Sequence, residues 1–177
     1  TILMLHFYRS IGRKMSRVVL INGEINEEMF SKVDERLNEL ESESLEPIVV
    51  RINSEGGHMT DGLAILGRLK ASKAPIYTEG YGLIQSSALP ILACGTLRKM
   101  SRYAWVMHHE SAQELQGTIS ELETQIRQSR REEQFWNKYM AEFSNQNSEF
   151  WRKSAIKNEL YLTAEQCLQY NIIDEII

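Results

Sequence analysis

Hydrophobic and polar positions alternate between two periods along the chain, which is the pattern of a domain built from both strands and helices. Short β-branched runs predict buried strands at "RVVLING" (17–23), "PIVVRIN" (47–53), "PIYTEG" (75–80) and "RYAWVMHH" (102–109). Apolar residues at helical spacing lie between these strands: Met29, Val33, Leu37 and Leu40 in one helix, then Leu63, Leu66 and Leu69 in the next. The alternation of strands and helices favours an α/β fold.

The C-terminal part of the chain is predicted to be mainly helical. Helical patterns cover 147–156 and "TAEQCLQY" (163–170), and "IIDEII" (172–177) predicts a closing strand. In the earlier helix that contains Leu66, Thr60 is a plausible N-cap. No repeat or linker interrupts the sequence, so residues 1–177 are expected to form one domain.

The segment 117–143 predicts a helix of roughly 40 Å, at 1.5 Å per residue. Apolar residues mark its two ends, whereas the middle, from Arg127 to Glu133, is polar on every face. This pattern indicates a helix that leaves the body of the domain and returns its tip to another surface. The alternative is a solvated helix stabilised by pairs such as Glu123 with Arg127.

Composition excludes several classes of function. The chain has 177 residues, 42% of them hydrophobic and 25% charged, and its net charge of -4 disfavours nucleic-acid binding. No segment is apolar enough to span a membrane, so a cytoplasmic protein is expected. Cys94 and Cys167 form no cluster with the four histidines, so no metal or other cofactor is expected and both are predicted to be buried.

Small and polar residues gather where three predicted strands end. The first group is "NSEGG" (53–57), in which two glycines allow positive φ angles and a close approach of the backbone to a ligand. The second is "GLIQSSALP" (82–90), where a serine at a strand-to-helix junction could present its hydroxyl beside unpaired amide donors. Pro90 supports a helix start here. Simple N-capping by Ser86 or Ser87 is the alternative to a nucleophile.

The third group is "VMHHES" (106–111), which contains adjacent histidines at a strand end. Neighbouring residues of a strand point to opposite faces, so only one of His108 and His109 can face a site. A histidine near a candidate serine matters because a serine hydroxyl is a poor nucleophile without a neighbouring base. Spacing alone does not decide which histidine faces inward.

These groups, taken in order, resemble the ClpP family of serine peptidases. "INSEGG" is similar to the family's "INSPGG", and "GLIQSSALPILACG" to "GQAASMGAFLLAAG", which aligns Ser86 with the nucleophile. "VMHHES" resembles "VMIHQP", which aligns His109 with the general base. "LYLTAEQCLQYNIIDEII" resembles the closing "RFLSAEEAKEYGLIDEVI".

The resemblance implies a ClpP/crotonase-like fold of repeated ββα units, with residues 117–143 as a protruding handle helix. It also implies a Ser-His-acid triad and an oxyanion hole formed by the backbone amides of Gly57 and Ser87. In the family the handle stacks two heptameric rings face to face around a chamber in which polypeptides are cleaved. An AAA+ Clp unfoldase is the partner that the family implies, although the N-terminal segment 1–16 is short and no tail follows Ile177.

The acid of the triad has two candidates. Aligned backwards from "YLTA", the family's aspartate falls on Glu159, whereas aligned forwards from the preceding helix it falls on Asn158. The downstream block is the better anchored, so Glu159 is the preferred acid. Leu160 stands where the family has a basic residue.

Two other functions remain open from the sequence. A catalytically silent, ClpR-like subunit that assembles with active paralogues would fit the uncertain acid and the unusual "QSSALP". An acyl-CoA enzyme of the crotonase fold would use the oxyanion hole without a serine nucleophile. The retention of both Ser86 and His109 favours the active serine endopeptidase over these two.

Overall fold

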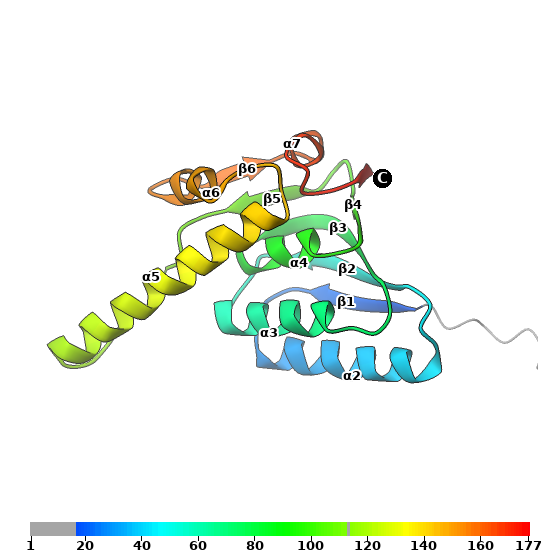
Figure 1. Ribbon diagram of the computed structural model, residues 1–177, viewed down its shortest axis with the longest axis horizontal. Helices are drawn as coiled ribbons and strands as arrows, with labels where there is room; N and C mark the ends of the chain where they lie inside the picture. The colour runs from blue at the N-terminus through cyan, green and yellow to red at the C-terminus, as the bar shows by residue number, and fades with distance from the viewer. Residues whose placement is uncertain (1–16, 113) are drawn as a thin grey trace, which may run out of the picture.

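The computed structural model describes residues 17–112 and 114–177, and the N-terminal segment 1–16 lies outside this range. A seven-stranded sheet forms the centre of the domain, with helices packed against it (Figure 1). The strands are β1 (Val18–Asn22), β2 (Ile48–Ser54), β3 (Ile76–Gln85), β4 (Leu97–Met100), β5 (Trp105–His108), β6 (Leu160–Leu162) and β7 (Glu175–Ile176). The helices are α2 (Glu27–Glu43), α3 (Met59–Lys70), the 3-10 helix η1 (Ser86–Ala88), α4 (Leu89–Ala93), α5 (Ile119–Glu142), α6 (Ser148–Ala155) and α7 (Ala164–Gln169).

The sheet branches at β3. Its parallel path runs β1-β2-β3-β4-β7, while β5 also pairs in parallel with β3 and then in antiparallel with β6. The first half of β3 pairs with β4 as far as Gly80, which lies opposite Met100. The second half pairs with β5, beginning with Leu83 opposite Trp105. One long strand therefore belongs to both arms of the sheet.

An irregularity at Gly82 separates the two halves of β3. Gly82 has a φ of 57°, and the register of β2 against β3 shifts between Ile52 and Ser54. The Asn53 side chain fills the irregularity, because its Oδ1 accepts the Leu83 amide at 3.1 Å. A Cβ at position 82 would lie 2.5 Å from this Oδ1, so the arrangement requires glycine.

Helices α2 and α3 cover the sheet with the faces that the sequence predicts. Val33, Leu37 and Leu40 of α2 are fully buried, as are Leu66 and Leu69 of α3. Each helix thus contributes one apolar stripe to a continuous core.

The prediction that Thr60 caps α3 is wrong. The helix begins at Met59, so Thr60 lies within its first turn and His58 occupies the cap position with an extended backbone. The chain turns into the helix directly after Gly57, before Thr60 is reached. The His58 ring contacts Asp61 of the first turn, with 3.1 Å between Nδ1 and Oδ2.

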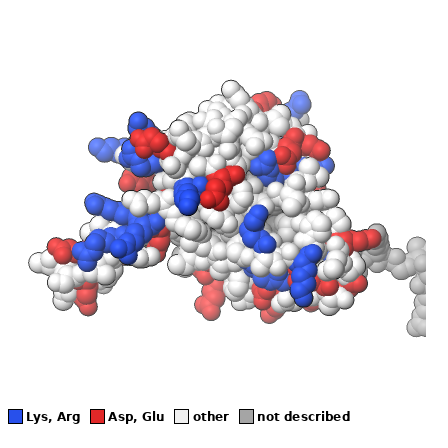
Figure 2. Space-filling model, in the orientation of Figure 1, with Lys and Arg blue, Asp and Glu red and all other residues white. Residues whose placement is uncertain are grey.

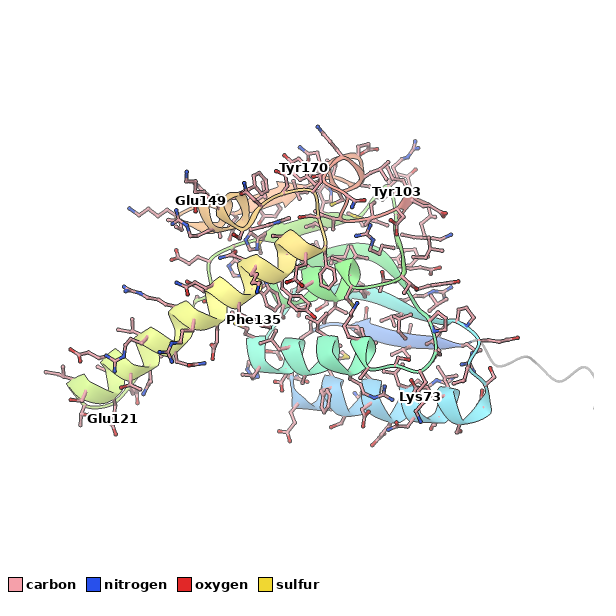
Figure 3. The ribbon with its side chains drawn as sticks, in the orientation of Figure 1. Lys73, Tyr103, Glu121, Phe135, Glu149 and Tyr170 are labelled. Atoms are coloured by element: carbon pink, nitrogen blue, oxygen red, sulfur yellow. The ribbon has the colours of Figure 1, made fainter. Side chains whose placement is uncertain are left out.

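Helix α5 projects from the body of the domain (Figure 1), in line with the apolar ends and polar middle of its sequence. Thr118 and Glu121 form a capping box at its start. Trp136 and Met140 are buried near its C-terminal end, whereas Ile119 at the start is 78% exposed. Figure 3 shows Glu121 at the projecting tip and Phe135 where the helix reaches the body.

Basic and acidic side chains are intermingled over the face shown in Figure 2, and basic side chains gather along the projecting helix. This agrees with the mixed charge of the sequence between Arg127 and Glu133. The described residues contain no helix that combines the length and the apolar character needed to cross a membrane.

Four strands, β3 to β6, differ clearly from the sequence prediction. The pattern did not reveal β4 or β6, because they have only four and three residues, too few for a period of two to show. The predicted strand 102–109 begins later, at Trp105, because residues 102 and 103 form a turn. β3 continues to Gln85 instead of ending at residue 80, which brings the strand directly to Ser86.

Both cysteines are buried, as predicted. Burial raises the pKa of the Cys94 thiol to about 12, and it raises the pKa of Cys167 to about 12 as well. Neither thiol is therefore available as a thiolate near neutral pH.

Candidate active site

Ser86 stands at the junction between β3 and η1, in a strained backbone conformation. Its φ is 49°, a region that residues with a side chain adopt rarely. The preceding Gln85 is still extended and has no capping side-chain bond, and Ala88 takes the cap position of α4. Neither Ser86 nor Ser87 is therefore a helix cap, which excludes that explanation of the two serines.

Gly56 makes room for this conformation of Ser86. The φ of Gly56 is 91°, and a Cβ added there would lie 2.8 Å from the Ser86 Cβ and 2.7 Å from the Gln85 carbonyl oxygen. Gly56 also donates its amide to the Ser54 hydroxyl at 3.0 Å. The backbone of the "NSEGG" turn thus packs directly against the junction that presents Ser86.

The structure brings Ser86 and His109 together. Strand β5 lies beside the end of β3, with Met107 opposite Gln85, so His109 leaves β5 close to Ser86. The distance between His109 Nε2 and Ser86 Oγ is 2.9 Å, which is a hydrogen bond. In the tautomer with Nε2 unprotonated, the serine hydroxyl donates to the imidazole.

The backbone amides of Gly57 and Ser87 are the candidate oxyanion donors; Ser87 directly follows Ser86 in the sequence, and Gly57 belongs to the "NSEGG" turn. Gly57 has a φ of 153° and forms an isolated β-bridge with Ile25. The two hydrogen bonds of this bridge run from the Ile25 amide to the Gly56 carbonyl oxygen and from the His58 amide to the Ile25 carbonyl oxygen. In an extended segment the intervening amide points to the opposite side. Ser87 is the second residue of η1, where amides have no acceptor within the helix. Among the described residues, this local geometry makes both amides candidates for binding an anion.

Gly57 cannot be replaced without moving the backbone. A Cβ at this position would lie 2.1 Å from the Ile25 carbonyl oxygen and 2.8 Å from the Ile25 nitrogen. The bridge between Ile25 and Gly57 therefore fixes the position of the candidate oxyanion donor against the core.

His108 points away from the Ser86 hydroxyl and into the protein. It is 2% exposed, its Nε2 donates to the Trp151 carbonyl oxygen at 3.1 Å, and its ring meets the Trp151 ring edge to face. Burial lowers the pKa of His108 to about 4, against an ordinary value of 6.5. His108 is therefore a neutral structural donor at physiological pH.

The two candidates for the acid lie in the turn before β6. The antiparallel ladder of β5 and β6 ends with His108 opposite Leu160, so His109 follows its end on one chain and Glu159 precedes it on the other. The Glu159 carboxylate accepts the Tyr161 hydroxyl at 2.8 Å, while the Asn158 amide reaches the Ile156 carbonyl oxygen at 3.5 Å. Within the described residues neither side chain has a hydrogen bond to His109.

A cavity of about 610 Å³ opens beside the serine and the histidine. Its lining is partly apolar, from Met59, Trp136 and Ile156, and partly charged, from side chains that include Arg130 and Glu133. Helix α5 thus contributes one wall of the cavity.

A hydrogen bond connects α5 to the segment that follows His109. The Ser111 hydroxyl donates to Glu133 Oε1 at 2.9 Å. Sequence reasoning did not predict that Ser111 and Glu133 line the cavity, or that Tyr161 bonds to Glu159. For Tyr161 the sequence offered one signal, its spacing of two from Glu159, which is the spacing of residues on one face of a strand. The sequence offered no comparable signal for Ser111 or Glu133.

Comparisons with known proteins agree on one family. The family model described as Clp protease matches residues 6–177. The chain is 30% identical to ATP-dependent Clp protease proteolytic subunit 2 from Prochlorococcus marinus, over 96% of this chain and 86% of that protein. It is 31% identical to proteolytic subunit 3 from a Synechococcus strain, with the same coverage.

A solved structure supports the same assignment. A mutant form of ClpP1 from Listeria monocytogenes superposes with a TM-score of 0.84 and 30% identity, covering 92% of this chain and 91% of that one. The predicted ClpP/crotonase-like fold is therefore confirmed.

The buried His108 predicts a loss of stability in mild acid. The unfolded chain binds a proton at His108 near pH 6.5, whereas the folded protein does so near pH 4. Protonation of His108 therefore does not reduce the free energy of unfolding above pH 6.5. Between pH 6.5 and pH 4 the free energy of unfolding falls, because only the unfolded chain binds the proton. At about 1.4 kcal/mol per pH unit, the loss amounts to roughly 3 kcal/mol. Urea unfolding between pH 7 and pH 4 measures it.

The matched variants are His108→Ile and His58→Gln, each lacking one histidine. His108→Ile should flatten the dependence of the unfolding free energy on pH over this range, even if its stability at pH 7 is lower. His58→Gln removes an exposed ring and should keep the wild-type slope. An unchanged slope in His108→Ile would show that other groups cause the acid sensitivity.

Proposed function

The chain belongs to the Clp protease family, and on this premise we propose that it is a serine endopeptidase subunit that cleaves unfolded polypeptides or short peptides. The observation that carries the proposal is the hydrogen bond of 2.9 Å between Ser86 Oγ and His109 Nε2. It supplies the base that a serine hydroxyl needs in order to act as a nucleophile.

Acylation begins at this hydrogen bond. His109 takes the hydroxyl proton while Ser86 Oγ attacks the peptide carbonyl carbon, which gives a tetrahedral intermediate with a negatively charged oxygen. The amides of Gly57 and Ser87 stabilise that oxygen, and they do so without reorganisation because the backbone already holds them in place. His109 then gives the proton to the departing amine, and the acyl-enzyme remains.

Deacylation repeats these steps with water. His109 takes a proton from the water molecule as its oxygen attacks the ester carbon, and then returns a proton to Ser86 Oγ as the peptide acid leaves. The same two amides stabilise the second intermediate. The cavity beside the pair, walled by α5, is wide enough for side chains of an extended substrate.

Glu159 is the proposed acid. Opposite residues of an antiparallel ladder share a face, and so do residues two apart in one strand. If the ladder is continued by one residue beyond its last pair, His108 with Leu160, Glu159 falls on the face of His109 and Tyr161, and Asn158 falls on the other face. The pairing of β5 with β6 and the alignment from "YLTA" therefore favour the same residue.

Assembly into two stacked heptameric rings and work with an AAA+ Clp ATPase are proposed from family membership. Helix α5 supports the first part, because its exposed Ile119 and Ile126 and its projection from the body provide a surface for another subunit. The proposed chamber would admit only chains that are unfolded or short.

The runner-up function is a catalytically silent ring subunit. The observation in its favour is that the described structure records no hydrogen bond between His109 and a carboxylate, while Glu159 bonds to Tyr161. A silent subunit would keep the fold and the assembly but would not react with an acylating reagent.

Replacing Ser86 separates these functions. Wild-type protein should react with a fluorophosphonate and hydrolyse a short fluorogenic peptide, and Ser86→Ala should lose both activities because it lacks the nucleophilic oxygen. Ser87→Ala is the matched control, since it removes the adjacent hydroxyl but keeps the backbone amide, and it should retain measurable turnover. Modification mapped to a residue other than Ser86 would contradict the assignment, and an unreactive wild type would favour the silent subunit.

The acid is tested by two variants measured on one peptide. Glu159→Gln keeps the shape of the side chain but removes the charge that stabilises the imidazolium, so kcat should fall by about two to four orders of magnitude. Asn158→Ala should reduce kcat far less. The reverse ranking would assign the role to Asn158, and wild-type turnover in both would leave a Ser-His dyad.

Sedimentation tests the assembly. The proposed rings predict a species many times heavier than the 20.5 kDa chain at micromolar concentration and low salt. Ile119→Glu should weaken assembly, because it places a charge in the surface proposed to meet another subunit, whereas Glu123→Gln on the same exposed helix should have little effect. A wild-type protein that sediments as a monomer under these conditions would refute the rings.

A further inference from the structure

Tyr161 is the one side chain that the described structure shows bonded to the proposed acid. Its hydroxyl donates to Glu159 Oε2 at 2.8 Å. Tyr161 belongs to β6 and lies opposite Met107 in the ladder, two residues before His109 on the facing strand. The pairing of β5 with β6 therefore fixes the backbone of Tyr161 relative to the end of β5, from which His109 follows.

A glutamate in this position needs such an anchor. Its side chain has one more rotatable bond than an aspartate, and holding a longer side chain in one conformation costs more entropy. Glu159 is also exposed, so water competes for its carboxylate. The Tyr161 hydroxyl, which is held in place because Tyr161 belongs to β6, restricts the conformations of the Glu159 carboxylate on the face proposed to be shared with His109.

We propose that Tyr161 is a positioning residue of the active site, which holds the Glu159 carboxylate so that its second oxygen can accept from His109 Nδ1. The proposal rests on the serine peptidase function and on Glu159 as the acid. A carboxylate accepts hydrogen bonds on both oxygens, and the tyrosine engages Oε2. Oε1 is therefore the oxygen that would accept from the histidine.

The titration of the phenol agrees with this contact. The hydrogen bond to Glu159 is the main cause that raises the pKa of Tyr161 above its ordinary value. The phenol thus keeps its proton, and its role as a donor, throughout the pH range in which a serine peptidase works.

The chain contains a matched control on the same sheet. Tyr81 of β3 also donates to a glutamate two residues away, with 3.2 Å between its hydroxyl and Glu79 Oε2. Glu79 pairs with Arg51 rather than with a histidine. Tyr81→Phe therefore removes the same kind of bond without touching the proposed triad.

The experiment is a double-mutant cycle of Tyr161→Phe and Glu159→Gln, measured as kcat and KM on one short fluorogenic peptide. Tyr161→Phe keeps the ring and its packing, and it should lower kcat about three- to tenfold with little change in KM, as expected for the loss of one hydrogen bond. In the Glu159→Gln background the same substitution should have almost no further effect. Tyr81→Phe should have wild-type kcat, and sedimentation should show the same assembly for every variant.

Each other outcome overturns the role of Tyr161. Unchanged or increased kcat in Tyr161→Phe would mean that the tyrosine does not orient the acid, or that it holds the acid away from His109. Additive losses in the cycle would mean that it acts through another group. An active wild type with either result leaves the peptidase function standing, whereas an inactive wild type refutes both proposals together.

Discussion

The close packing of Ser86 against Gly56 is the constraint on which the site depends. A serine with a φ of 49° is strained, and such a conformation persists only where the surrounding structure leaves no alternative. Here the absence of a side chain at Gly56 lets one turn lie directly against the strand-to-helix junction. The same turn contains Gly57, whose amide is one of the two proposed oxyanion donors.

The branching of the sheet makes the second contribution. Asn53 fills the irregularity at Gly82 with its side chain, and β3 can then leave β4 and continue beside β5. Because β5 runs parallel to the end of β3, His109 emerges next to Ser86. Asn53 and Gly82 thus support the change of partner that brings the candidate nucleophile and its base to the same end of the sheet.

The sequence revealed the α/β class, the projecting helix and the groups around Ser86 and His109, because each depends on local patterns of residues. The short strands β4 and β6 were missed, since three or four residues show no period and their pairing is set by distant segments. The choice between His108 and His109 needed the family alignment, and the structure explains it by the burial of His108 against Trp151. The bond of Tyr161 to Glu159 was missed because the sequence shows only that the two residues are two positions apart, which is true of many pairs that do not bond.

The short pairing of β5 with β6 affects how the protein loses activity on heating. Within the described part of the chain, β6 pairs over three residues and with β5 alone, whereas β2 pairs with β1 on one side and with β3 on the other. Weakly paired segments open with much smaller free energies than core strands. Local opening of this arm would separate Glu159 and Tyr161 from His109 while the rest of the sheet stays folded, so thermal inactivation would precede denaturation and would be reversible on cooling.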